Sequence, residues 1–119
     1  MFVFLEGATG AGKSTVTSRL QQMGYRVHHE NFIDLCMRNP EFPAHSLVMQ
    51  TKWIAELVAG LQRHASAYET DPTSVKHGVV FFDRSPLTPA IYAARDPSLD
   101  DACKSCVHPF FPQEFIVTL

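Results

Sequence analysis

A glycine-rich octapeptide near the N-terminus limits the possible folds of this chain more than any other segment. Its sequence is Gly7-Ala8-Thr9-Gly10-Ala11-Gly12-Lys13-Ser14, which matches the pattern G-x-x-x-x-G-K-[ST] of a phosphate-binding loop, the Walker A motif. Glycines let the backbone wrap closely enough for its N–H groups to hold phosphate oxygens. The helix that follows such a loop adds a favourable field for the anion at its N-terminus.

The segments on either side of the octapeptide have the structure that the motif requires. Residues 2–5 form a continuous apolar run, typical of a strand that is buried on both faces. After the loop, Val16, Leu20 and Met23 recur at helical spacing, and Gly24 is placed to end the helix. The sequence therefore predicts a strand, a phosphate loop and a helix in direct succession.

Two side chains of the loop have defined tasks in this motif. The lysine reaches the β- and γ-phosphates, and the serine offers its hydroxyl to Mg²⁺. We therefore predict that the octapeptide and Thr15 bind a nucleotide phosphate chain, with Lys13 on the phosphates and Ser14 on the metal ion.

Length and composition exclude several other classes of protein. A chain of 119 residues suggests one domain, and 45% hydrophobic with 18% charged residues indicates a globular protein. A net charge of −2 argues against polynucleotide binding through a broad basic surface. No apolar run is long enough to span a membrane. Because the strand and loop begin at once, we expect no signal peptide, and a reduced, cytoplasmic setting is the default expectation.

Apolar strand-like runs alternate with helical segments along the rest of the chain. Further strands are expected at residues 25–28, 78–82 and 115–119, and helices at 31–35, 44–68 and 86–93, with a short helix possible within 98–107. In the long helix, the expected apolar face consists of Leu47, Ile54, Leu57, Val58, Leu61, Ala65 and Tyr68. This alternation predicts an α/β fold with a parallel sheet and right-handed crossovers.

Polar residues follow three of the predicted strands, where parallel α/β sheets bind their ligands. Glu6 and the phosphate loop follow the first strand, Glu30 follows the second, and Asp83-Arg84-Ser85 follow the third. Four apolar residues before Asp83 give this strand the form of a Walker B strand. The chemistry needs an acid there to hold Mg²⁺ beside Ser14, so we predict that Asp83 binds the metal ion.

A second candidate metal site is the pair Cys103 and Cys106, with His108 close by. A structural zinc site needs four ligands, usually from two clusters, but no second cluster is present and Cys36 is isolated. Val107 also separates Cys106 from His108, so the haem-attachment pattern is not met. We therefore predict reduced thiols without a metal ion.

These motifs together resemble the P-loop nucleoside and nucleotide kinases, and most closely the deoxynucleoside kinase and thymidylate kinase group. The similarity rests on Phe-Leu-Glu-Gly leading into Gly-Ala-Gly-Lys-Ser-Thr, the acid after the second strand, and the acid-Arg-Ser triplet. The triplet usually begins with Glu in deoxynucleoside kinases, where this chain has Asp83, and their strand-two acid is commonly followed by proline, where this chain has Asn31.

The resemblance implies a three-layer P-loop fold with strand order 2-3-1-4, and ATP and Mg²⁺ as cofactors. It further implies that Glu30 is the general base on a sugar 5′-hydroxyl and that Arg84 neutralises charge on the acceptor side. It also implies that Gln50, on the long helix, reads the edge of the base. For Gln50, the alternative is an exposed polar residue on an amphipathic helix.

The favoured reaction is transfer of the γ-phosphoryl group of ATP to a nucleoside-type hydroxyl. One alternative is a nucleoside-monophosphate kinase, which needs no general base, and another is a nucleotide-binding module without turnover. A signalling GTPase is not expected, because the chain has no N-K-x-D-type guanine motif.

Relatives in these families continue past the last strand into an arginine-bearing lid, a fifth strand and a loop that holds adenine. We therefore expect residues 1–119 to form a single domain truncated before the lid, with Arg84 and Arg95 as the remaining arginines near the phosphates. On this basis, we expect phosphate binding with slow or no turnover, and self-association through the open sheet edge.

Overall fold

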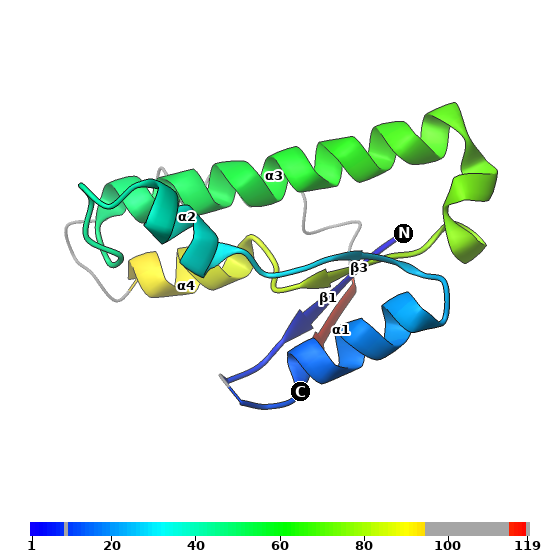
Figure 1. Cartoon of the computed structure of the whole chain (residues 1–119), viewed down its shortest axis with the longest axis horizontal. Coiled ribbons are helices and arrows are strands. Elements are labelled where there is room, and N and C mark those ends of the chain that lie inside the picture. Colours follow the sequence, from blue (N-terminus) through cyan, green and yellow to red (C-terminus); the bar gives the residue numbers. More distant parts are fainter. Residues whose placement is uncertain (9, 95–114, 119) are drawn as a thin grey trace. The chain divides into compact units, whose positions relative to one another are not determined.

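The structure is a computed structural model that describes residues 1–8, 10–94 and 115–118 (Figure 1). The possible helix within 98–107, the Cys103, Cys106 and His108 group, Arg95 and Thr9 lie outside the described residues. The described elements are β1 (Phe2–Glu6), α1 (Lys13–Gln22), β2 (Arg26–His28), α2 (Phe32–Arg38), α3 (Leu47–Thr70), η1 (Pro72–Ser74), η2 (Lys76–Gly78), β3 (Val80–Asp83), α4 (Leu87–Ala94) and β4 (Phe115–Thr118).

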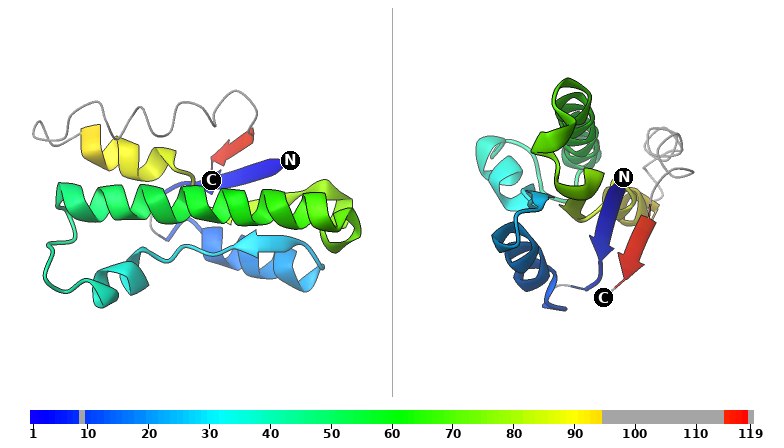
Figure 2. Two further views of the ribbon diagram at one scale, coloured as in Figure 1. Left: turned by 90° about the horizontal axis from the view of Figure 1, so that it is seen from above. Right: turned by 90° about the vertical axis from the view of Figure 1, so that its right-hand side faces the viewer.

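The strands form one parallel sheet of four strands in the order β2-β3-β1-β4. This confirms the predicted α/β fold with a parallel sheet, including the predicted strand order. In the register of the sheet, Leu5 pairs with Asp83 and His28 pairs with Phe82. Figure 2 shows β1 and β4 side by side and running in the same direction. The carboxyl ends of all these strands therefore lie at one edge.

The chain folds into two compact units. One unit comprises residues 1–30, 60–85 and 113–119, and the other comprises residues 31–59 and 86–112. The first unit contains the sheet, α1 and the C-terminal part of α3, whereas the second contains α2, the N-terminal part of α3 and α4. The prediction of a single domain over residues 1–119 stays a prediction.

The core of the first unit is built from the apolar runs of the inner strands β1 and β3. Phe4 and Phe82 are almost completely buried, and their ring centroids lie 5.2 Å apart. Val3, Leu5 and Val80 are also buried. Consecutive residues of each strand are buried, so both faces of the inner strands are covered, which explains the continuous rather than alternating apolar pattern.

The residues of α3 that are buried in the core of the second unit differ in part from the predicted apolar face of this helix. Met49, Trp53 and Leu57 are buried with Leu35 of α2, and Phe32 stacks on Trp53 with ring centroids 4.3 Å apart. Two members of the predicted face, Leu47 and Tyr68, are instead exposed by 43% and 47%. Periodicity identifies side chains that share a helix face, but it does not show how far along the helix that face is covered.

The boundaries of several elements differ from the predicted ones by a few residues. Strand β3 begins at Val80 rather than at residue 78, because His77 and Gly78 adopt φ angles of 54° and 66° that close the turn η2. Helix α2 extends beyond residue 35 to Arg38 and ends before Pro40, which disfavours a helical conformation in the residue before it. Within residues 1–8, 10–94 and 115–118, no helix is long and apolar enough to cross a membrane.

Candidate functional site

The phosphate loop connects β1 to α1 through backbone conformations that favour glycine. Gly10 and Gly12 have φ angles of +82° and +94°, and a Cβ atom at either position would meet nothing within 4 Å. Their requirement for glycine is therefore conformational and not steric. Gly12 is the N-cap of α1, and its carbonyl accepts the first helical hydrogen bond, from the Val16 N–H over 3.0 Å.

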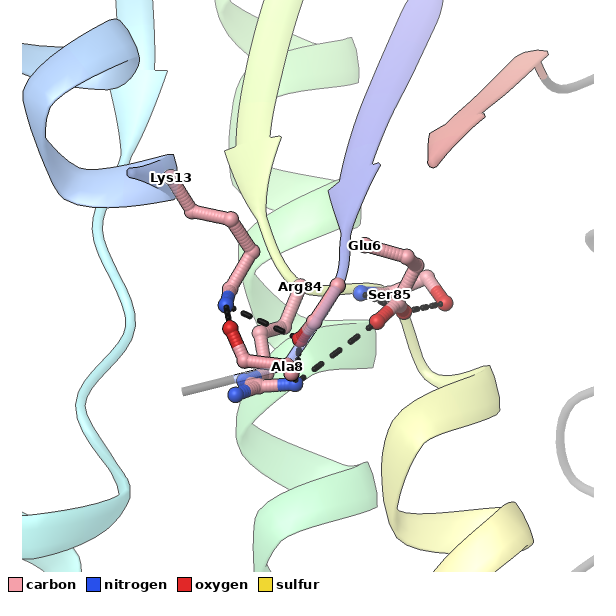
Figure 3. Close-up of polar contacts among 6 residues, drawn as sticks. Glu6, Ala8, Lys13, Arg84 and Ser85 are labelled. Carbon is pink, nitrogen blue, oxygen red and sulfur yellow. Dashed lines mark hydrogen bonds and ion pairs between the residues drawn. The ribbon is translucent and has the colours of Figure 1, made fainter. Parts of the chain in front are cut away.

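Lys13 is the first residue of α1, and its ammonium group is folded onto its own loop (Figure 3). Its Nζ atom donates to the carbonyl oxygens of Gly7 over 2.9 Å and Ala8 over 2.7 Å, and the residue is only 6% exposed. A buried charge needs hydrogen-bonding partners, which these neutral carbonyls supply. A phosphate oxygen would be a stronger acceptor for the same ammonium group, since both partners would then be charged.

Ser14 and Asp83 meet at the edge of the sheet. The Ser14 hydroxyl donates to Asp83 Oδ2 over 3.3 Å, and Asp83 is 3% exposed as the last residue of β3. The other carboxylate oxygen of Asp83, Oδ1, is buried and has no hydrogen-bond partner. An unsatisfied buried carboxylate oxygen is costly, which makes this position suited to a cation.

The donor atoms at this position fit Mg²⁺ better than a transition metal. Mg²⁺ prefers oxygen ligands, and it is usually held by one or two carboxylates together with waters and substrate phosphates. Ser14 and Asp83 offer a hydroxyl and a carboxylate beside the phosphate loop. In the part of the chain that the structure describes, no group of three or more His, Cys, Asp or Glu side chains could hold a metal ion.

Glu6 and Ser85, which the sequence placed at the ligand-binding edge without assigning them a role, connect the ends of β1 and β3. Glu6 Oε1 accepts hydrogen bonds from the Ser85 backbone N–H over 2.8 Å and from the Ser85 hydroxyl over 2.5 Å. Ser85 is completely buried. The sequence contained a signal for this contact: an acid ends one predicted strand, and a hydroxyl side chain follows another. Because neighbouring parallel strands end at the same edge of a sheet, such residues can come into contact.

Arg84 lies between these two residues and the phosphate loop. Its Nη1 atom donates to the Gly7 carbonyl over 3.2 Å and lies 3.9 Å from Glu6 Oε2 (Figure 3). The Arg84 backbone has a φ angle of 83°, a region in which a residue with a side chain is strained. The Gly7 carbonyl therefore accepts from two cationic side chains, Lys13 and Arg84.

A family model described as an AAA domain matches residues 2–105. The chain belongs to this AAA domain family. The match includes the phosphate loop and Asp83, and it shows that the chain is a P-loop nucleotide-binding domain. A search of curated proteins gives no match to the chain.

In this AAA domain, Glu30 lies two residues beyond the end of β2 and is half-buried. Because β2 and β3 are parallel neighbours, Glu30, just after β2, and Asp83, the last residue of β3, lie at the same edge of the sheet. The sheet topology thus brings these two predicted site residues to one edge of the first unit.

Gln50 belongs to the second unit and is 5% exposed, so the alternative of an exposed polar residue is wrong. Its Nε2 atom donates to the Ala44 carbonyl over 3.2 Å, while its Oε1 atom is buried without a hydrogen-bond partner. The NH₂ group of the side-chain amide thus has its hydrogen-bond acceptor within the second unit. The amide oxygen remains able to accept a hydrogen bond.

Two histidines of the AAA domain pack on the central phenylalanine of β3. The ring of His28 stacks on Phe82 at 4.8 Å, and His64 of α3 meets Phe82 edge-on at 5.5 Å. Burial lowers the pKa of His64 below its ordinary value of 6.5, and the positive charges of Arg26 and Arg63 lower it further. The Arg26 Nη1 atom lies 3.4 Å from His64 Nδ1, so the imidazole favours the neutral form that accepts from the guanidinium.

Proposed function

We propose that this P-loop domain binds ATP with Mg²⁺ and transfers the γ-phosphoryl group to a hydroxyl of a nucleoside-type acceptor. The observation that carries the proposal is the buried Oδ1 atom of Asp83, which has no hydrogen-bond partner although Oδ2 accepts from Ser14. A metal ion bound to the phosphate chain would satisfy this oxygen. That arrangement is the one that Walker A and Walker B residues provide in phosphoryl-transfer proteins.

Charge neutralisation would come from residues around the loop. Phosphoryl transfer depends mainly on positioning and on electrostatic stabilisation of charge on the moving group. Lys13 would exchange its bonds to the loop carbonyls for bonds to the β- and γ-phosphates. Arg84, on the Gly7 carbonyl at the same loop, would supply a second positive charge. Mg²⁺ held by Ser14 and Asp83 would neutralise negative charge on the phosphate chain.

The acceptor side of the proposal rests on Glu30 and Gln50. Glu30 would accept the proton of the attacking hydroxyl, a role supported by its place at the carboxyl edge of the sheet, after β2. Gln50 would read the base, supported by its burial and by an amide oxygen that has no partner. An amide offers both a donor and an acceptor, so it can pair with a base edge and reject analogues that lack the matching group.

Two measurements test the proposal in sequence. Calorimetric titration with Mg·ATP, Mg·ADP and Mg·pyrophosphate should show binding by the wild-type chain, and its absence would refute the central claim. Labelled ATP and a panel of nucleosides and nucleoside monophosphates would then identify the acceptor. Label on nucleosides supports the proposal, label on monophosphates favours a monophosphate kinase, and binding without transfer favours a nucleotide-binding module.

A further inference from the structure

We infer that Glu6 is a positioning residue, which holds Arg84 at the phosphate loop and thereby sets the affinity of the site for a phosphate chain. This inference rests on the proposed function, because it concerns the same site. Glu6 itself would not touch the nucleotide. It would act through the conformation of the Arg84 guanidinium.

The two carboxylate oxygens of Glu6 make different contacts. Oε1 accepts both hydrogen bonds from Ser85, through the backbone N–H and the hydroxyl. Oε2 lies 3.9 Å from Arg84 Nη1 (Figure 3). The side chains of Arg84 and Glu6 are only 13% and 14% exposed, so this ion pair is less screened by water than a surface pair would be.

The contacts of Arg84 explain how Glu6 could influence phosphate binding. Its guanidinium donates to the Gly7 carbonyl, the same oxygen that accepts from Lys13. An arginine side chain has many rotamers, and fixing one of them before a ligand arrives lowers the entropic cost of binding. The carboxylate of Glu6, itself fixed by Ser85, is placed to do this. Without that carboxylate, the guanidinium would sample positions away from the loop.

The simplest alternative role for Glu6 is purely structural: its hydrogen bonds to Ser85 would hold the ends of β1 and β3 together. The substitution Glu6→Gln separates the two roles. The glutamine side-chain oxygen can still accept from the Ser85 N–H and hydroxyl, whereas its NH₂ group carries no negative charge and cannot form the ion pair with Arg84. The variant thus preserves the tie between the strands and removes the partner of the guanidinium.

The test measures the affinity for Mg·pyrophosphate by calorimetry, with the full chain. This probe contacts the phosphate site and has no base. We expect Glu6→Gln to weaken binding about 10-fold, which corresponds to about 1.4 kcal/mol of binding free energy, with the melting temperature of the ligand-free protein nearly unchanged. Glu56→Gln is the matched control, because it also removes a carboxylate that pairs with an arginine, Arg38 at 3.6 Å, in the second unit. This control should bind like wild type.

A double-mutant cycle separates positioning from a merely structural role. If Glu6 acts through Arg84, Glu6→Gln should have no further effect on affinity in an Arg84→Gln background. Equal losses in both backgrounds would overturn the inference. So would unchanged or tighter binding by Glu6→Gln, since the carboxylate would then act only as a negative charge near the anion. If wild-type protein itself failed to bind Mg·pyrophosphate and Mg·ATP, the proposed function would fail first.

Discussion

The Ser14 hydroxyl donates a hydrogen bond to Asp83 over 3.3 Å, although the two residues are 69 positions apart in the chain. The parallel pairing of β1 with β3 makes this contact possible, because it places Leu5 opposite Asp83 and the phosphate loop directly beyond. The contact leaves one buried oxygen of Asp83 without a partner. This asymmetry between the two oxygens leads to the first prediction.

Replacement of Asp83 by Asn should separate stability from metal binding. The neutral amide removes a buried charge, so the unfolding free energy without ligand should stay the same or rise. The gain in ADP affinity that Mg²⁺ provides should fall by at least about 10-fold, because a metal ligand is lost. Urea denaturation and calorimetry with and without Mg²⁺ measure the two effects. An Mg²⁺ effect on Asp83→Asn equal to that on wild type would exclude Asp83 as a ligand.

Lys13→Ala should remove most of the stabilisation that a nucleotide gives to the wild-type protein. At about 100 times the dissociation constant, a ligand stabilises the folded state by roughly 2.7 kcal/mol, on the order of 10 °C in melting temperature for a domain of this size. Thermal denaturation with and without Mg·ADP measures the shift. Lys76→Ala is a suitable control, since its Nζ also donates to a backbone carbonyl, that of Met23, but at an exposed site. A full shift in Lys13→Ala would contradict the assigned role.

Glu30→Gln should lower the turnover of a nucleoside acceptor about 10²- to 10⁴-fold, the usual contribution of a general base. ATP affinity should not change, because the substitution leaves the phosphate loop intact. A labelled-ATP assay and calorimetry measure the two quantities. Glu69→Gln, at an exposed glutamate, is the control. Normal nucleoside turnover by Glu30→Gln would exclude Glu30 as the general base and would remove the support that this residue gives to a hydroxyl acceptor.

Gln50→Ala should change acceptor preference more than ATP affinity. If the amide oxygen of Gln50 reads a base, its removal should reduce the ratio of kcat/KM for matched over mismatched acceptors by at least about 10-fold. The lost hydrogen bond to the Ala44 carbonyl should also reduce stability by about 1 kcal/mol. Competition between pairs of nucleosides measures acceptor preference. Gln62→Ala, at an exposed glutamine of the same helix, is the control and should leave this preference unchanged. An unchanged preference would remove Gln50 from the acceptor site.

The stability of the protein should fall as the pH falls below 6.5, in part because of His64. Its pKa in the folded state is lowered from 6.5 by burial and by Arg26 and Arg63, so at pH values between the two pKa values the unfolded chain binds a proton that the folded chain does not. This contribution is fully present above pH 6.5. Urea denaturation at pH 7.5 and pH 5.5 should show a smaller difference in the free energy of unfolding for His64→Gln than for wild type. An equal difference would assign the effect to other groups.

The sequence by itself determined the parts of the fold that depend on local chemistry. Positive φ angles at Gly10 and Gly12 and the first turn of the helix at Lys13 follow from the order of residues in the loop. The inner strands β1 and β3 were predictable because continuous apolar runs with polar ends are typical of strands that are buried on both faces. The contact between Ser14 and Asp83 was also expected, because Ser14 belongs to the phosphate loop after β1 and Asp83 ends β3.

Only the tertiary structure decided which polar groups pair and which apolar side chains are covered. The bonds between Glu6 and Ser85 cross 79 positions and depend on the register of β1 against β3, which no local pattern encodes. Similarly, α3 buries Gln50 and Met49 while Leu47 stays 43% exposed. The physical reason is that burial and pairing are properties of neighbours in space, whereas periodicity and motifs report only on neighbours along the chain.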